Sequence, residues 1–156
     1  GVRSERLLNA DVTPVCAPGL LVGRQPLRKP ADLAHHVLIH LRPSEWEEPR
    51  PDWGAWLKAR DLTDIDAQAG PRFDQTALAI EAAAHGQGVA LAPYAFVADD
   101  LAAGRLVAPF ADGALTTDFA YYVLIKRSGA TTAARTFVAW LKEEAHAAAE
   151  AGVDDL

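Results

Sequence analysis

Apolar residues are distributed along the chain in runs that predict several strands. Residues 89–92 form a continuous apolar run that Pro93 ends, which is typical of a strand covered on both faces. Residues 119–126 are rich in aromatic and β-branched side chains and predict a second strand. Residues 12–17 predict a third, and Pro14 within it favours a place at the edge of a sheet or at a crossover.

Two longer segments predict helices. The strongest internal helix is expected at residues 73–85, with Asp74 as its N-cap and Gly86 just after its end. A longer helix is expected at about residues 132–150, where apolar residues recur at i, i+3, i+4, i+7 and i+11 and Gly152 provides a stop. Together, the order of strands and helices predicts an α/β fold with a central mixed sheet.

Shorter elements are predicted between these. A strand is expected at residues 37–39, and a helix at 53–60 begins after Asp52, a good N-cap. Two tryptophans and a leucine share one face of that helix and predict core packing. Gly104 is expected to end a short helix, and a strand is expected between it and Phe110.

Charge, length and cysteine content narrow the class of protein. The chain has 156 residues and a net charge of −6, which argues against a nucleic-acid surface on this chain itself. No apolar run approaches a membrane span and no leader opens the chain, so we expect no membrane contact. A single cysteine fits a reducing cytoplasm. Because Gly1 is an unusual start and Met is absent, we expect a fragment.

Several residue types invite specific chemistry, and each has a simpler explanation. His35, His36 and His40 lack the partners and spacing of a zinc site, so we expect no metal and no cofactor. Cys16 has no resolving cysteine and is interpreted as a buried spacer instead of a redox sensor. Trp46, in a proline-rich loop, could reach a ligand. No hydrolase, protease or nucleotide-binding motif is present, and we expect that the chain is not an enzyme.

The segment at residues 70–76 is the best candidate site. A loop that feeds directly into a helix presents unpaired backbone N–H groups and the positive end of the helix dipole at one place. Asp74 either caps the helix or recognises an amine, and its carboxylate would repel an anionic ligand.

Five sequence landmarks in a fixed order resemble one family. They are VTPVCAPGLL, PLRKPADLAHHVLIH, GPRFD, HGQGVALAPYAFVADDLAAGRLVAPF and YYVLI. This order is similar to the effector-binding region of LysR-type transcriptional regulators, and within that family to the glycine-cleavage-activator branch. The resemblance implies a two-lobed fold like that of a periplasmic binding protein. Here it would comprise one near-complete lobe, residues 17–112, and the closing part of the other, residues 1–16 and 113–156.

The resemblance also implies a site in the cleft between the lobes. Pro71 and Phe73 would form an apolar wall, while Gln75 and Thr76 would offer hydrogen bonds beside Asp74. One of two adjacent tyrosines would reach the cleft from the first lobe; we favour Tyr121 over Tyr122. His40, at a strand end, is either a hydrogen-bonding residue of the cleft or a structural histidine.

The function that follows from the resemblance is regulatory. A small-molecule effector would bind between the lobes of a cytoplasmic homodimer or homotetramer and change the geometry of the DNA-bound oligomer. DNA contact would come only from a winged helix-turn-helix that is not seen in this sequence. The alternative is an extracytoplasmic solute-binding protein of the same fold.

Overall fold

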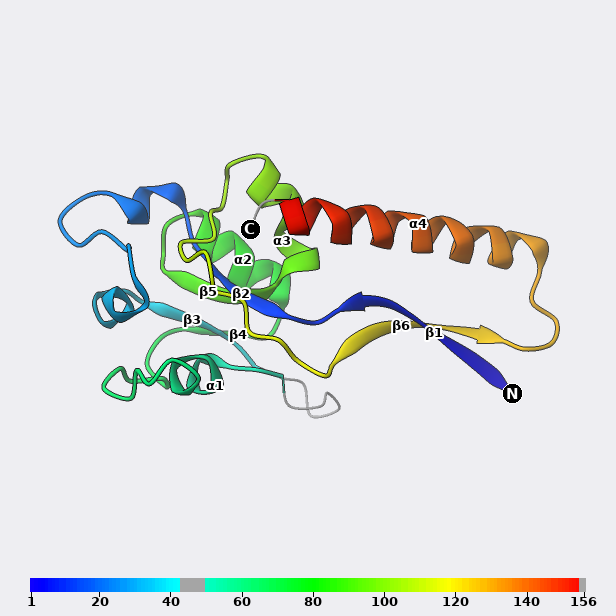
Figure 1. The fold of residues 1–156 in the computed structure, drawn as a ribbon, viewed down its shortest axis with the longest axis horizontal. Coiled ribbons are helices and arrows are strands. Elements are labelled where there is room, and N and C mark those ends of the chain that lie inside the picture. Colours follow the sequence, from blue (N-terminus) through cyan, green and yellow to red (C-terminus); the bar gives the residue numbers. More distant parts are fainter. Residues whose placement is uncertain (43–49, 155–156) are drawn as a thin grey trace.

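The computed structural model of this chain describes residues 1–42 and 50–154, and the side chains of residues up to 148. It contains two sheets, one of four strands and one of two (Figure 1). The strands are β1 (Val2–Asn9), β2 (Val12–Val15), β3 (Leu38–Leu41), β4 (Arg72–Phe73), β5 (Val89–Pro93) and β6 (Ala120–Lys126). The α-helices are α1 (Trp53–Lys58), α2 (Thr76–Ala84), α3 (Tyr94–Ala102) and α4 (Thr132–Asp154), with two 3-10 turns at Pro18–Leu21 and Pro30–His35.

The four-stranded sheet has the order β2-β5-β3-β4. β3 is parallel to both β4 and β5, whereas β2 is antiparallel to β5. The carboxyl ends of β3, β4 and β5 therefore lie at one edge of the sheet. β2 occupies an outer position and contains Pro14, which confirms the expected edge strand, because a proline cannot donate to a second neighbour.

Each face of this sheet carries its own core. On one face, Trp53 and Trp56 of α1 are almost fully buried, and each indole N–H donates to a backbone carbonyl. On the other face lie α2 and α3 (Figure 1), which pack through Ile80 and three alanines of α2 and through Val97 of α3. A sheet covered by helices on both faces explains the unbroken apolar run of β5, which is buried throughout. The predicted α/β class is confirmed.

β1, β6 and α4 form an elongated unit beside the larger sheet, which we call the arm (Figure 1). β1 and β6 pair antiparallel, and α4 lies along β1, where Lys142 Nζ donates to Glu5 at 2.6 Å. Phe137 and Trp140 of α4 remain about half exposed. β2, within the expected segment 1–16, pairs with β5 in the larger sheet, and the lobe boundaries stay a prediction.

Two of the expected element boundaries and one expected strand are wrong. α2 begins at Thr76 with Gln75 as its N-cap, because Arg72 and Phe73 are drawn into β4 by pairing with β3; Asp74 is therefore not the cap. The strand expected after Gly104 is reduced to a single bridge between Val107 and Cys16. α4 continues past Gly152 to Asp154.

Other local predictions are confirmed. Asp52 caps α1, its carboxylate accepting a hydrogen bond of 2.8 Å from the Ala55 N–H. Gly86 follows α2 with a φ of +75°, a conformation that glycine adopts without strain. In the described ranges 1–42 and 50–154, no helix is both long enough and apolar enough to cross a membrane. Trp46 lies outside the described residues.

Candidate functional site

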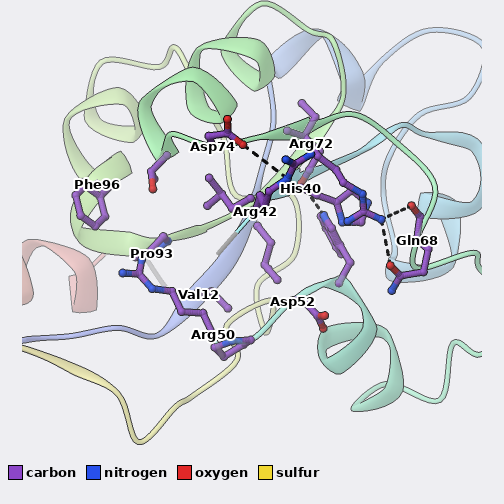
Figure 2. A pocket seen from close by; sticks show the side chains of 16 residues that line it. Val12, His40, Arg42, Arg50, Asp52, Gln68, Arg72, Asp74, Pro93 and Phe96 are labelled. Carbon is purple, nitrogen blue, oxygen red and sulfur yellow. Dashed lines mark hydrogen bonds and ion pairs between the residues drawn. The ribbon is translucent and has the colours of Figure 1, made fainter. Parts of the chain in front are cut away.

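A cavity of about 390 Å³ opens at the edge of the larger sheet where β3, β4 and β5 end (Figure 2). It lies on the α1 face, and Asp52 and Trp53 at the start of α1 form one side of it. Thr76 of α2 and Phe96 of α3 contribute from the carboxyl edge. In open α/β sheets this edge is the usual position of a ligand site, and the volume suits a small organic molecule.

Strand register explains which side chains form the floor of the cavity. Side chains two residues apart share a face, and cross-strand partners share it too. His40 is opposite Arg72, Leu38 is opposite Val89, and Val12 is opposite Pro93. This pattern places one set of lining residues on a single face of the sheet: Val12, Leu91, Pro93, His40, Arg42, Arg72 and Asp74.

Charged side chains surround the cavity and partly pair with one another. Arg42 Nε lies 3.7 Å from Asp74 Oδ1, and both side chains are more than half exposed (Figure 2). Arg72 Nη2 donates to the carbonyl oxygen of Gln68 at 2.9 Å and to its Oε1 at 3.1 Å. The Gln68 contacts therefore hold the Arg72 guanidinium beside the cavity.

His40 is the one polar lining side chain that is nearly buried among the described residues, at 6% exposed. Its Nε2 donates to the Ala69 carbonyl at 2.8 Å, and its backbone N–H donates to the Pro71 carbonyl at 2.9 Å. Gly70 lies between those two acceptors with a φ of +119°. His40 therefore fixes the 69–71 loop against β3 and forms part of the floor of the cavity.

Tyr121 of the arm contacts two residues that line the cavity. The Tyr121 ring packs edge-on against Phe96 with centroids 5.6 Å apart, and its hydroxyl accepts a hydrogen bond of 3.3 Å from Arg50 Nη1. Phe96 and Arg50 both line the cavity. Tyr122 is 55% exposed and has no part in these contacts.

The structure brings together some of the residues expected in the site. His40, Asp74 and Thr76 line the cavity, and Tyr121 contacts two of its lining residues. Pro71, Phe73 and Gln75 are not among the described lining residues. Phe73 packs against the core beneath α2, because neighbouring residues of a strand face opposite sides.

Sequence reasoning missed the arginines of this cavity. Arg42 follows β3, Arg72 lies in β4, and Arg50 precedes α1. Arg42 was within reach of sequence reasoning, because it lies three residues after the strand predicted at 37–39 and parallel strands end at ligand sites. Arg72 belongs to the quoted GPRFD landmark, but only the pairing of β4 with β3 shows which way it faces.

The remaining chemical candidates do not form a site. Within the described part of the chain, no three histidine, cysteine or acidic side chains are arranged to hold a metal ion. Cys16 is fully buried, and burial raises the pKa of its thiol to about 12, which keeps it protonated and unreactive at neutral pH. The interpretation of Cys16 as a spacer agrees with this environment.

The fold and the cavity define an α/β domain of the ligand-binding class. The chain belongs to the LysR substrate binding domain family, which it matches over residues 1–146. This match confirms the resemblance seen in the sequence.

Known relatives agree with this family. The chain is 41% identical over 130 residues to the glycine cleavage system transcriptional activator of Escherichia coli K12, covering 83% of this chain and 40% of that protein. It is 31% identical over 146 residues to the transcriptional activator AmpR of Pseudomonas aeruginosa, covering 93% of this chain and 46% of that protein. The chain thus spans less than half the length of these two relatives. Both are transcriptional regulators, so the expectation of a non-enzyme is confirmed.

Solved structures confirm the fold. The effector domain of AmpR from Pseudomonas aeruginosa superposes with a TM-score of 0.69 at 30% identity, covering 98% of this chain and 70% of that one. The bromide-bound regulatory domain of HypT from Salmonella typhimurium superposes with a TM-score of 0.58 at 20% identity, and it supports the fold alone. The chain therefore has the fold of a LysR effector-binding domain.

Proposed function

We propose that this chain is the effector-binding part of a LysR-type transcriptional regulator and that a small molecule binds in the cavity at the ends of β3, β4 and β5. The observation that carries the proposal is the cavity itself, a hollow of about 390 Å³ with both apolar and charged lining residues. Leu91, Pro93 and Phe96 offer apolar surface to such a molecule. Thr76 and His40 add polar groups that can orient it.

An effector in this cavity would act through the contacts of Tyr121. Arg50 and Phe96 line the cavity, and both also contact Tyr121 of the arm. A molecule that draws Arg50 into the cavity would weaken its hydrogen bond with Tyr121 and change how the arm packs against the larger sheet. The arm would then have two arrangements, with and without the Arg50–Tyr121 hydrogen bond. An effector can shift the balance between them only by the difference in its affinity for the two.

The remaining parts of the proposal concern the whole protein. The regulator would act in the cytoplasm as a homodimer or homotetramer and would contact DNA through a winged helix-turn-helix outside this chain. The kinship with transcriptional activators supports this choice over an extracytoplasmic solute-binding protein. Sequencing the gene on both sides of this segment tests the choice, because a signal peptide in place of a DNA-binding unit would contradict it.

A pair of variants tests the cavity directly. Thr76→Tyr places a bulky side chain at the half-buried first residue of α2, where it would fill the cavity. Ala77→Tyr is the matched control, because Ala77 is exposed and is not among the described lining residues. A metabolite panel would be tested on the 156-residue chain by thermal shift and calorimetry. We expect binding to survive in Ala77→Tyr and to be lost in Thr76→Tyr.

The two variants also separate the possible failures. If a compound binds both variants as well as the parent chain, it binds elsewhere and the cavity assignment is wrong. If no compound of any charge class binds the parent chain, the proposal of a small-molecule site here fails.

A further inference from the structure

The described lining of the cavity has a positive net charge, whereas the chain as a whole has a negative one. The protein carries 21 acidic and 15 basic side chains, for a net charge of −6. The described cavity lining contains three arginines and two aspartates, and His40 donates its Nε2 hydrogen bond to the Ala69 carbonyl. A positive hollow on a negative protein favours a negative ligand, because the field is focused where the surrounding surface is low in dielectric.

The two aspartates of the lining are already partnered. Asp52 Oδ1 accepts the hydrogen bond that caps α1. Asp74 lies 3.7 Å from Arg42, and this exposed pair is weak, so an anion can replace the carboxylate at little cost. Asp74 does not therefore exclude an anion as its position in the sequence suggested.

Arg72 has the geometry of a preorganised anion receptor. Among its contacts with described residues, both hydrogen bonds engage Nη2 and both go to Gln68. A guanidinium has five N–H donors in one plane, so its other nitrogens can meet a carboxylate or a phosphate. Because Gln68 already holds the side chain, less conformational entropy is lost on binding.

The start of α2 adds a second positive element. α2 has nine residues, and its N-cap, Gln75, makes no side-chain capping hydrogen bond. The N–H groups of its first turn and the positive end of its dipole therefore lie beside Asp74 and Thr76, at the wall of the cavity. Asp74 and Arg42 point toward one another at this place (Figure 2).

From these observations we infer that the effector is a small organic anion whose carboxylate or phosphate binds Arg42 and Arg72 while its apolar part packs on Pro93 and Phe96. The inference rests on the proposed function and specifies its ligand class. All four residues line the same cavity, and Arg42 and Arg72 share one face of the sheet by register. Tight binding would require both the charged contacts and the apolar contacts, since ligand sites combine apolar surface with a few polar groups.

A matched series of four-carbon probes tests the sign of the ligand. Succinate, succinamide and 1,4-diaminobutane have similar length and carry two negative charges, none and two positive charges. Isothermal titration calorimetry of the 156-residue chain would compare their affinities, with inorganic phosphate as a probe of the anionic group alone. We expect succinate to bind at least about tenfold more tightly than succinamide, as charge-assisted contacts to guanidinium groups require.

Arginine variants locate the anion. Arg42→Gln and Arg72→Gln should each weaken succinate binding about tenfold, since each removes one charge-assisted partner. Arg24→Gln is the matched control, because Arg24 is exposed in the loop before Leu27, and the described cavity lining does not include it. An unchanged affinity in both cavity variants, or a loss in Arg24→Gln instead, overturns the inference.

The result also separates this inference from the proposed function. If succinamide or 1,4-diaminobutane binds as tightly as succinate and Thr76→Tyr blocks it, the cavity is a ligand site but the anion preference is wrong. If none of the probes and no metabolite binds, the proposed function fails as well.

Discussion

Gly70 allows the 69–71 loop to pack against β3, and replacing Gly70 with alanine should lower the stability of the fold. Its φ of +119° is a conformation that side chains rarely adopt. A Cβ atom at this position would lie 1.9 Å from the carbonyl oxygen of Leu38, well inside the 3.0 Å below which real Cβ atoms essentially never occur. The loop would therefore have to move away from β3 by about 1 Å, the difference between those two distances.

The free-energy cost follows from what that movement breaks. The side chain and the backbone of His40 donate to the carbonyls on either side of Gly70, at 2.8 and 2.9 Å. Losing both costs about 2 kcal/mol, at about 1 kcal/mol for each hydrogen bond. Backbone strain adds about 1–3 kcal/mol. We therefore expect Gly70→Ala to lower the free energy of unfolding by about 3–5 kcal/mol, a large share of the 5–15 kcal/mol typical of domains.

Gly104→Ala is the matched control. Gly104 also has a positive φ, +71°, but a Cβ atom there would meet nothing within 4 Å. Its cost should be about 1–2 kcal/mol, from the left-handed conformation alone. Urea unfolding, followed by the fluorescence of the buried Trp53 and Trp56, would measure both variants. If Gly70→Ala is no less stable than Gly104→Ala, the close approach to Leu38 does not constrain the loop.

Substitutions at three further positions test other features. Because burial raises the pKa of Cys16 from 9.0 to about 12, the unfolded chain loses this proton first, and stability should fall as pH rises from 9 toward 12. Cys16→Ala should reduce that slope in thermal melts; equal slopes would contradict the argument. Asp52→Ala should cost about 1 kcal/mol in urea unfolding through loss of the α1 cap, and Asp52→Ser should retain most of it. Trp56→Phe leaves the Gly113 carbonyl, 2.7 Å from the indole nitrogen, without its donor and should cost about 1–3 kcal/mol; an unchanged urea midpoint would show that water replaces the indole.

Local sequence signals predicted the elements whose causes are local. Asp52 caps the helix it precedes, and the unbroken apolar run before Pro93 forms the buried strand β5. Pro14 confines its strand to an edge. Each of these outcomes depends on a residue and its neighbours in the chain, which is the information that a sequence contains.

The prediction of where α2 begins failed because that boundary depends on contacts between distant segments. Arg72 and Phe73 extend as β4 because His40 and Leu41 pair with them, and this pairing delays the start of α2 to Thr76. The same pairing turns Arg72 toward the cavity and Phe73 away from it. Periodicity within residues 70–76 contains no sign of that partner, so the orientation of the site could not be predicted from this segment alone.

The position of the arm strands in the chain sets an order of folding. The larger sheet uses residues 12–93, and Leu115 joins it by bridging Val12, whereas β1 must find β6 from the opposite end of the described chain. Closing so long a loop is entropically costly and slow, so β1, β6 and α4 should assemble last and open first. Their amide protons should exchange with solvent faster than those of β3 and β5. The cavity, except for its contacts with Tyr121, is then complete before β1 and β6 pair. A ligand can therefore bind a molecule whose arm is still unfolded.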